Sequence, residues 1–432
     1  MVRHTVFLHD SDSVNGSVVR EQDFGMDRAY DIAVVGGGLA GSAAALAVAR
    51  RGYRTAFVAP PAKAVDGRTT ALMMPSIELL QQLDVWSGIE NAAAPLRAMR
   101  IIDATSRLVR APTVTFHASE LDIDAFGYNI PNAPLLKALG KAAASCREIT
   151  CYPNAATSIN ERPDHVEIVL DDGSALTAGL AVGADGRNSK VRGAAGIRAH
   201  DWRYPQTAIV LNFKHEYPHA DTSNEFHTEN GPFTQVPLPG RKSSLVWALA
   251  PAQAEAMQTM PADELAAAIE ERMQSILGKV TVEGAVQRFA FSGMIARSFG
   301  RGRMALVGEA GHVFPPIGAQ GLNLGLRDVL EFVSALDRAG GPANAAAVTR
   351  RYDRARRSDV VSRTASVDML NRTLLHDFLP VQLLRSGGLA ALSAIAPLRI
   401  FAMREGMKPG SGFSSLGRSR WRERDRPEAA RR

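Results

Sequence analysis

Residues 30–59 decide the fold and read YDIAVVGGGLAGSAAALAVARRGYRTAFVA. The opening run YDIAVV is short and apolar, which predicts a buried strand, and the alanine-rich run over 42–50 predicts a helix. The closing RTAFVA predicts a second strand. Between the first strand and the helix, residues 36–41 read GGGLAG and match the spacing G-x-G-x-x-G. The sequence therefore predicts a strand–helix–strand unit built around a glycine-rich turn.

Each glycine of this turn has its own physical role. Gly36 permits the tight turn, Gly38 lets a pyrophosphate approach the backbone, and Gly41 lets the helix pack closely on the strand. The helix N-terminus adds free N–H groups and a partial positive charge, which favour phosphates. The complete unit predicts a bound dinucleotide rather than a merely glycine-rich loop.

The acidic residue that usually ends the second strand and binds the ribose is missing. That place reads Val58-Ala59-Pro60. The ribose contact must therefore come from elsewhere or be absent, and this position does not distinguish FAD from NAD.

A second motif, GADGRNSKVR, occupies residues 183–192 and follows an apolar run. Asp185 and Gly186 stand where that predicted strand ends. A carboxylate in this place either holds ribityl or ribose hydroxyls or shapes the turn, since Asp and Gly are both common turn residues. The residues alone leave both interpretations open.

A third motif, MALVGEAGHVFPPIGAQGLNLGLRD, occupies residues 304–328. The run ALVG, which ends at Gly308, predicts a buried strand that Glu309 closes. We interpret His312 as a packing residue of the loop rather than a catalyst.

The rest of this motif predicts a stiff loop followed by a helix. Pro315 and its neighbour restrict the backbone, and Gly318 and Gly321 leave N–H groups accessible to a flat ligand. From residue 322 to about 338 the apolar positions repeat with helical spacing.

Together the three motifs resemble the fingerprints of the single-component flavoprotein aromatic hydroxylases of the p-hydroxybenzoate hydroxylase type. The run HVFPPIGAQGLNLGLRD resembles more specifically the ubiquinone-biosynthesis hydroxylases of the 2-polyprenyl-6-methoxyphenol hydroxylase type. Residues 68–86 (RTTALMMPSIELLQQLDVW) and 231–239 (GPFTQVPLP) are similar to the same group. The resemblance extends from about Tyr30 to Met407.

The resemblance implies tightly bound FAD and a set of residues around it. Glu309 stands where the family usually has aspartate, so the loop shifts or the contact loosens. The helix after the loop is expected to point its N-terminus at the pyrimidine edge of the flavin, where its dipole stabilises an anionic reduced flavin. The expected cofactor-binding residues are Gly36, Gly38, Gly41, Arg68, Asp185, Gly186, Gly308, Glu309, Gly318, Gly321, Leu322 and Asn323.

The resemblance also implies a flavin-facing loop that includes Pro315, Gly318 and Gln320. Arg68 either gates flavin movement or forms a surface salt bridge. No acid or base residue is required by the expected chemistry, and we assign no catalytic residue from the sequence.

The implied reaction has two stages. NADPH or NADH, as a transient donor, reduces FAD. O2 then adds to flavin C4a, and the resulting hydroperoxide hydroxylates the aromatic ring of a polyprenylphenol on the way to ubiquinone. No second G-x-G-x-x-G is present, so the nicotinamide has no Rossmann domain of its own. The alternatives are a hydroxylase of a small soluble phenol, an FAD-dependent reductase, and a non-catalytic flavoprotein of a biosynthetic complex.

We expect an α/β fold in which a Rossmann-like FAD-binding domain carries an inserted, mostly antiparallel sheet that holds the substrate, with helices at the C-terminus. The expected units are a disordered extension at 1–25, the FAD-binding domain at 26–200 with 288–343, the substrate domain at 201–287, C-terminal helices at 344–407 and a disordered basic tail at 408–432.

Charge and composition exclude several classes of protein. Of the net charge of +6, most lies in residues 417–432, which hold seven arginines and three acidic residues, so we expect no nucleic-acid-binding face. Cys146 and Cys151 fit neither a disulfide framework nor a zinc site, which favours a reducing cytoplasm. We also expect no metal site, since Pro218 interrupts the helical spacing of the nearest histidine pair.

The segment 378–403 is apolar but is interrupted by Arg385, Arg399 and prolines. We expect a buried helix here. The alternative is peripheral contact with the inner face of the cytoplasmic membrane or with other ubiquinone-biosynthesis proteins.

Overall fold

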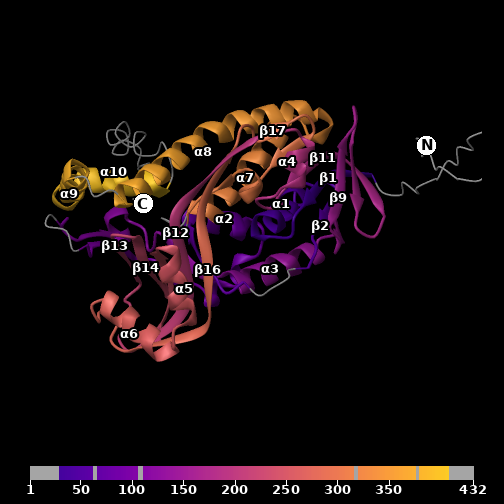
Figure 1. The fold of residues 1–432 in the computed structure, drawn as a ribbon. Helices are drawn as coiled ribbons and strands as arrows, with labels where there is room; N and C mark the ends of the chain where they lie inside the picture. The colour runs from indigo at the N-terminus through magenta and orange to yellow at the C-terminus, as the bar shows by residue number, and fades with distance from the viewer. Residues whose placement is uncertain (1–28, 62–65, 106–109, 316–319, 376–378, 408–432) are drawn as a thin grey trace, which may run out of the picture.

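A computed structural model describes most of the 432-residue chain. The described ranges are 29–61, 66–105, 110–315, 320–375 and 379–407. The expectations for 1–25 and 408–432 lie outside these residues. Figure 1 shows one part around β1 (Ala29–Val35) and α1 (Leu39–Ala49), which is called the cofactor-binding part after the sequence prediction, and a second sheet around β12 (Ala199–His215) and β16 (Val280–Ala296). A long helix, α8 (Ala345–Leu375), runs along both toward α9 and α10.

The first sheet has the strand order β17-β18-β11-β1-β2-β8, with β9 and β10 added beside β11. Strand β1 pairs in parallel with β2 and β11, and α1 (Leu39–Ala49) connects β1 to β2, so the predicted strand–helix–strand unit is confirmed. The strands are β1 (Ala29–Val35), β2 (Thr55–Val58), β8 (Ile149–Tyr152), β9 (Ala156–Glu161), β10 (Val166–Leu170), β11 (Ala175–Gly183), β17 (Gly300–Arg301) and β18 (Met304–Leu306).

Helices cover this sheet because both of its faces are apolar. On one face α1 packs with α3 (Asn132–Ala144) and α7 (Gln320–Arg338), around buried residues such as Val34 and Leu46. On the other face the core includes Val35 and Val191, the latter from α4 (Lys190–Ala194). The predicted helix after the third motif is therefore present as α7.

The second sheet has the order β19-β16-β12-β15-β14-β13-β5-β6 and is antiparallel except where β5 meets β13. The predicted strands TAIVLNF, GPFTQVPL and SSLVWALA are confirmed. The sheet also includes residues outside 201–287. Its strands are β5 (Ala98–Asp103), β6 (Val114–His117), β12 (Ala199–His215), β13 (Thr222–Thr228), β14 (Gly231–Leu238), β15 (Lys242–Leu249), β16 (Val280–Ala296) and β19 (His312–Val313).

Two helices, α5 (Pro251–Thr259) and α6 (Ala262–Arg272), cover one face of this sheet. Opposite them, a three-stranded sheet in the order β3-β7-β4 joins the second sheet to the rest of the molecule. Thr69 Oγ1 lies 2.8 Å from Ser244 Oγ across this junction. The elements here are β3 (Thr69–Met73), α2 (Met74–Gln82), β4 (Ala94–Pro95) and β7 (Gly127–Pro131), and the short 3-10 helices are η1 (Trp86–Gly88), η2 (Glu90–Ala92), η3 (Ala118–Leu121), η4 (Gly308–Ala310) and η5 (Pro342–Asn344).

The C-terminal helices are α8 (Ala345–Leu375), α9 (Leu379–Ala394) and α10 (Ala396–Met407). Met403 of α10 joins a small core with β6, and Arg399 forms an ion pair with Glu120 at 2.7 Å. Most side chains over 387–398 are nevertheless exposed, so the expected buried helix is wrong for this stretch. Within the described residues no single helix has the length and hydropathy to cross a membrane, although Gly387–Ala394 and Ala396–Glu405 reach that standard as a pair bent by 106°.

Candidate active site

The glycine-rich turn has the geometry of a phosphate cradle. Gly36 has φ of 121°, and a Cβ there would collide with the carbonyl of Ala184. A Cβ on Gly41 would collide with the carbonyl of Gly36, whereas a Cβ on Gly38 would meet no heavy atom within 4 Å. Gly36 and Gly41 are thus required by the protein's own packing, and Gly38 faces open space at the start of α1.

The N-terminus of α1 has neither a side-chain cap nor an acidic residue to compensate its free N–H groups. Its N-cap, Gly38, supplies no side-chain hydrogen bond, and the first turn of the helix holds no acidic residue. Ser42, one turn into the helix, has a buried hydroxyl with no hydrogen-bond partner among the described residues. The free N–H groups and the positive end of the helix dipole therefore remain available to an anion.

The two carboxylate oxygens of Asp185 have different surroundings: one binds the backbone of the following turn, and the other has no partner among the described residues. Its Oδ2 accepts hydrogen bonds from the N–H groups of Lys190 at 2.6 Å and Val191 at 3.3 Å. Its Oδ1 is buried with no partner among the residues that the structure describes. A buried carboxylate oxygen normally has a donor, so this atom fits a cofactor hydroxyl while the other oxygen shapes the turn at Gly186, whose φ is 77°.

Glu309 reaches toward the second motif. Its carboxylate, with 53% of the side chain exposed, lies 3.3 Å from Nε of Arg187, and Arg187 also donates to Ser292 Oγ at 2.7 Å. Arg187 thus brings the second motif, the third motif and β16 together. The sequence placed Arg187 inside a quoted motif but held no signal that it would bridge to Glu309.

The last residue of the third motif, Asp328 of α7, is a buried carboxylate. It accepts hydrogen bonds from the N–H of Gly308 at 2.8 Å, from Nε2 of His312 at 2.7 Å and from Nε of Arg356 at 2.7 Å. Burial raises the pKa of Asp328, but the charges of His312 and Arg356 outweigh this and hold it below the usual value. His312 is buried between Phe299 and Phe314, as a packing residue of the loop would be.

The flavin-facing loop is only partly described. Pro315 is buried, Gly318 lies outside the described residues, and Gln320 begins α7. Asn323 is used within the protein: its Oδ1 accepts from the N–H of Met73 and from Ser76, and its Nδ2 donates to the carbonyl of Ala71. The expected contact of Asn323 with the cofactor therefore rests on its backbone. Of the two neighbours, Gly321 is exposed and Leu322 is half-buried.

Arg68 lies between the cofactor-binding part and the second sheet. Its guanidinium makes a bidentate ion pair with Asp66, with both contacts at 2.8 Å, and lies 5.2 Å from the ring centre of Phe289. The pKa of Arg68 is raised, first by the hydrogen bond to Asp66 and, against the effect of burial, by the charges of Asp66 and Glu309. Asp66 is therefore the partner in the salt bridge that was one of the two interpretations of Arg68. Nothing in the sequence pointed to Asp66.

The face of the second sheet that looks away from α5 and α6 carries an apolar patch, called the apolar face below, next to the polar side chains of Asn212, Ser244 and Gln287. Ala208, Val210, Ala248 and Phe291 form its buried cluster, and Tyr204, Val246 and Phe289 pack against it. Helix α8 closes one side, where Tyr204 donates to Asp368 at 2.7 Å. Arg68 and Phe289 therefore connect this apolar face to the motifs that fit the cofactor.

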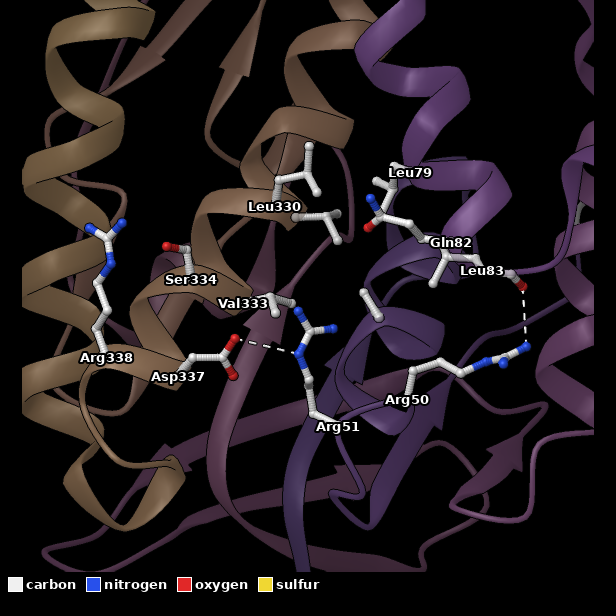
Figure 2. Close-up of a pocket in the computed structure, with 12 residues that line it drawn as sticks. Arg50, Arg51, Leu79, Gln82, Leu83, Leu330, Val333, Ser334, Asp337 and Arg338 are labelled. Atoms are coloured by element: carbon white, nitrogen blue, oxygen red, sulfur yellow. Dashed lines mark hydrogen bonds and ion pairs between the residues drawn. The ribbon is translucent and has the colours of Figure 1, made fainter. Parts of the chain in front are cut away.

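A pocket of about 380 Å³ lies elsewhere, between α1, α2 and α7 (Figure 2). It is found at the C-terminal ends of α1 and α7, opposite to the ends that carry the motifs. Arg50 pairs with Asp84 at 2.8 Å and Arg51 pairs with Asp337 at 3.4 Å. The protein's own acids thus offset two of the arginines, and the pocket is not part of the cofactor site.

The residues present fit FAD. The open space beside Gly38, the uncapped start of α1 and the free oxygen of Asp185 offer a phosphate cradle and a hydroxyl acceptor in one region. Gly36, Gly41, Gly186 and Gly308 shape the backbone around it. No described residue at the end of β2 replaces the missing ribose acid, since Ala59 and Pro60 follow the strand.

Comparison with known proteins gives the same assignment. The model of the FAD binding domain family matches residues 29–365. The ubiquinone hydroxylase UbiL of Rhodospirillum rubrum is 33% identical over 394 residues, which cover 88% of this chain and 90% of the relative. The 3-demethoxyubiquinol 3-hydroxylase of Escherichia coli is 31% identical over 386 residues, which cover 87% of this chain and 97% of the relative.

Solved structures share the fold. The p-nitrophenol 4-monooxygenase PnpA of Pseudomonas putida has a TM-score of 0.71 at 18% identity and covers 90% of this chain and 98% of its own. PqsL of Pseudomonas aeruginosa, a probable FAD-dependent monooxygenase, has a TM-score of 0.69 at 18% identity, covering 84% of this chain and all of its own. The motifs, the geometry and the relatives agree, and the chain belongs to the FAD-dependent aromatic hydroxylases of ubiquinone biosynthesis.

Proposed function

We propose that this enzyme uses NADPH or NADH and O2 to hydroxylate the aromatic ring of a polyprenylated phenol on the way to ubiquinone. The observation that carries the proposal is the apolar face of the second sheet, with Val210, Phe289 and Phe291, beside motifs that fit FAD. The relatives named for ubiquinone hydroxylation support the same substrate class.

In this proposal the reduced flavin supplies the oxygen-activating chemistry, and the chain binds and orients the reactants. The start of α1 holds the pyrophosphate, and Oδ1 of Asp185 accepts a hydroxyl of the cofactor. The N-terminus of α7 would offer the positive end of its dipole to the bound flavin, where it would stabilise negative charge. The apolar face excludes water from the reacting ring.

Arg68 has a place in this arrangement because it touches both parts. Its ion pair with Asp66 is exposed enough to exchange, and its stacking on Phe289 places it beside the apolar face. We propose that Arg68 contacts the flavin and influences its position. We assign no acid or base.

The substrate class follows from the kind of polar groups near the sheet. A small phenol that carries a carboxylate calls for a buried arginine. Among the described residues, Arg356 is the arginine whose side chain is almost fully buried, and it pairs with Asp328 and Asp359 behind the cofactor motifs. A long apolar substrate fits the face of Val210 and Phe291 better than a small acid does.

The test is turnover of purified enzyme under ¹⁸O₂ with NADPH or NADH. A polyprenylphenol should gain one labelled oxygen, as measured by mass spectrometry, while p-hydroxybenzoate should gain none. Oxidation of the nicotinamide with no label in any product would identify a reductase, and labelling of only the small phenol would overturn the lipid assignment. A parallel profile of quinone lipids in cells that lack the protein should show less ubiquinone and a precursor short of one oxygen.

We also propose that the corner between α9 and α10 contacts the membrane in which such a substrate resides. Ile395 and Leu398 are 50% and 41% exposed at this corner, and the two helices bend by 106°. Apolar side chains on an exposed helical corner favour insertion at the lipid interface. Arg399 pairs with Glu120 of η3, and Met403 packs on β6, so α10 lies at the β6 edge of the second sheet.

Vesicle flotation tests this contact. Replacement of both Ile395 and Leu398 by Glu should remove binding to vesicles of phosphatidylglycerol and phosphatidylethanolamine without loss of FAD. The control is Tyr217→Glu, a change at another exposed residue with a large apolar side chain, which is 52% exposed and lies in the connection between β12 and β13. Equal flotation of the double variant and the parent would overturn the proposal and would favour a protein, rather than a membrane, as the partner of this corner.

A further inference from the structure

We propose that Asp328 is a positioning residue for FAD: it holds the early part of the third motif, Gly308 to His312, against the glycine-rich turn, so that the cofactor meets a preformed site. It would touch no substrate and no reacting atom. The inference uses the family's FAD binding and does not depend on the identity of the phenol.

Asp328 holds the third motif at two points. Its Oδ2 accepts both the N–H of Gly308, where the motif leaves β18, and Nε2 of His312, four residues further on. Asp328 itself lies on α7, two turns after the helix begins at Gln320. One carboxylate of α7 therefore binds the segment 308–312 at both of its ends.

The point held by Asp328 lies against the phosphate-binding helix. A Cβ on Gly308 would be 3.2 Å from Cβ of Ala40, in the first turn of α1. A Cβ on Gly325 would be 3.3 Å from Cα of Gly308 and 3.5 Å from Cβ of Ala40. α7, the third motif and α1 thus meet at small residues with little room to spare. A shift of Gly308 would move the backbone beside the turn that cradles the pyrophosphate.

Arg356 of α8 supplies the opposite charge. Its Nε donates to Oδ1 of Asp328 at 2.7 Å, and its Nη1 donates to Asp359 at 2.5 Å. The side chains of Asp328 and Arg356 are 0% and 1% exposed. A buried carboxylate is maintained only when its charge and its hydrogen bonds are compensated. Three donors on two oxygens meet this requirement, so the loop, α7 and α8 are bound to a single group.

A purely structural role for Asp328 makes a different prediction. If the group only stabilises the fold, its loss lowers the free energy of unfolding, but the protein that remains folded binds FAD as before. If it positions the third motif, the affinity of the folded apoprotein for FAD falls as well. Affinity and stability are separate measurements, so the two roles are distinguishable.

The first experiment compares Asp328→Asn with the parent, each prepared as holoenzyme and then deflavinated. Asparagine keeps the size and one acceptor oxygen but loses the charge and places an amide donor against the donors of Arg356 or His312. We expect the Kd for FAD, measured by quenching of flavin fluorescence, to rise about tenfold or more, as loss of a hydrogen bond to a charged group implies. Unfolding of both apoproteins in urea gives the stability separately.

A second pair of variants tests the same inference with a smaller disturbance. His312→Phe keeps an aromatic ring between Phe299 and Phe314 but cannot donate to Asp328, whereas His312→Gln loses the ring and keeps a donor of similar reach. Positioning through Asp328 predicts weaker FAD binding in His312→Phe and rescue in His312→Gln. Packing alone predicts the opposite order.

Glu167→Gln is the matched control, because Glu167 of β10 pairs with Arg162 and makes no side-chain hydrogen bond to the three motifs among the described contacts. Its Kd for FAD should equal that of the parent. If Asp328→Asn does not fold, the two His312 variants decide. Unchanged FAD affinity in folded Asp328→Asn, or unchanged affinity in His312→Phe together with a loss in His312→Gln, would overturn the inference.

Discussion

The N-terminal and C-terminal ends of α1 and α7 differ in whether charged side chains of the protein compensate the helix dipole. At the N-terminal ends neither helix has an acidic residue in its first turn, and α1 begins at Gly38 with no side-chain cap. At the C-terminal ends, shown in Figure 2, Arg50 and Arg51 follow α1 and Arg338 ends α7. Cationic side chains at these ends stabilise the helices, because the C-terminal end of a helix carries a partial negative charge.

The difference shows which end is left for a ligand. The C-terminal ends are neutralised within the chain, since Asp84 and Asp337 pair with Arg50 and Arg51. The N-terminal end of α1 keeps its donors and has open space beside Gly38. We therefore interpret the N-terminal end of α1, with its unpaired donors, as the end that is left for a ligand, and the pocket at the C-terminal ends as an internally neutralised surface.

The largest expected effect comes from adding a methyl group inside the glycine-rich turn, where it would displace the backbone that shapes the N-terminal end of α1. Gly41→Ala places Cβ against the carbonyl of Gly36, a backbone atom that cannot move aside. We expect the Kd for FAD to rise at least about a hundredfold, or about 3 kcal/mol, as overpacking at a rigid site implies. The control is Gly140→Ala, in α3, where a Cβ meets nothing within 4 Å. Equal FAD binding by both variants would contradict this account of the turn.

The second effect concerns the charges buried behind the middle of α7. The pKa of Asp359 is lowered to about 2: burial opposes the shift, and Arg356, Arg327 and Arg363 produce it. A depressed folded-state pKa contributes stability that is present above the unfolded value of 3.8 and is lost as pH falls toward 2. Its size is about 2 kcal/mol.

Urea unfolding at pH 7, 5 and 3 measures this contribution. The parent should lose stability between pH 5 and 3, and Asp359→Asn should lose less over the same interval while being less stable at pH 7. Glu167→Gln, with an exposed partner in Arg162, controls for the removal of one acid. Parallel pH curves for the parent and Asp359→Asn would show that Asp359 does not titrate as described.

A smaller effect is expected where α7 meets the third motif. Gly325→Ala puts Cβ 3.3 Å from Cα of Gly308, a contact that a few tenths of an ångström would relieve. The cost is about 1 kcal/mol, which corresponds to FAD binding weaker by about fivefold. The dissociation constant of the apoprotein for FAD checks this. An unchanged constant would mean that the contact of α7 with Gly308 is looser than its geometry indicates.

The glycine-rich turn at the N-terminal end of α1 was predictable from the sequence, whereas the contacts from distant segments that hold the motifs in place were not. GGGLAG predicted the turn at Gly36 and Gly41 because the spacing of glycines reports local backbone geometry. The same logic placed Asp185 at the end of a strand, where the structure gives it one structural oxygen and one buried oxygen with no described partner. Local motifs thus predict local geometry well.

Contacts between distant segments left no such signal. Asp328 stands in the motif GLNLGLRD, but its partner Arg356 lies twenty-eight residues later, in a run that the sequence predicted only as part of the C-terminal helices at 344–407. Asn323 was expected to meet the cofactor, yet its side chain binds Met73 and Ser76. Tertiary pairing depends on which helix faces which loop, and a single sequence does not contain that information in its periodicity.

The smallest effect is expected at the C-terminal ends. The side chains of Arg51 and Asp337 are 46% and 47% exposed and 3.4 Å apart. Exposed pairs of this kind contribute about 0.5 kcal/mol or less, because solvent screens them and ordering two side chains costs entropy. Arg51→Gln and Asp337→Asn should each change the free energy of unfolding by no more than this amount, and the Kd for FAD should not change. A loss of FAD affinity in either variant would show that the pocket at the C-terminal ends is coupled to the cofactor site through the length of α1 or α7. The two ends could then no longer be regarded as functionally separate.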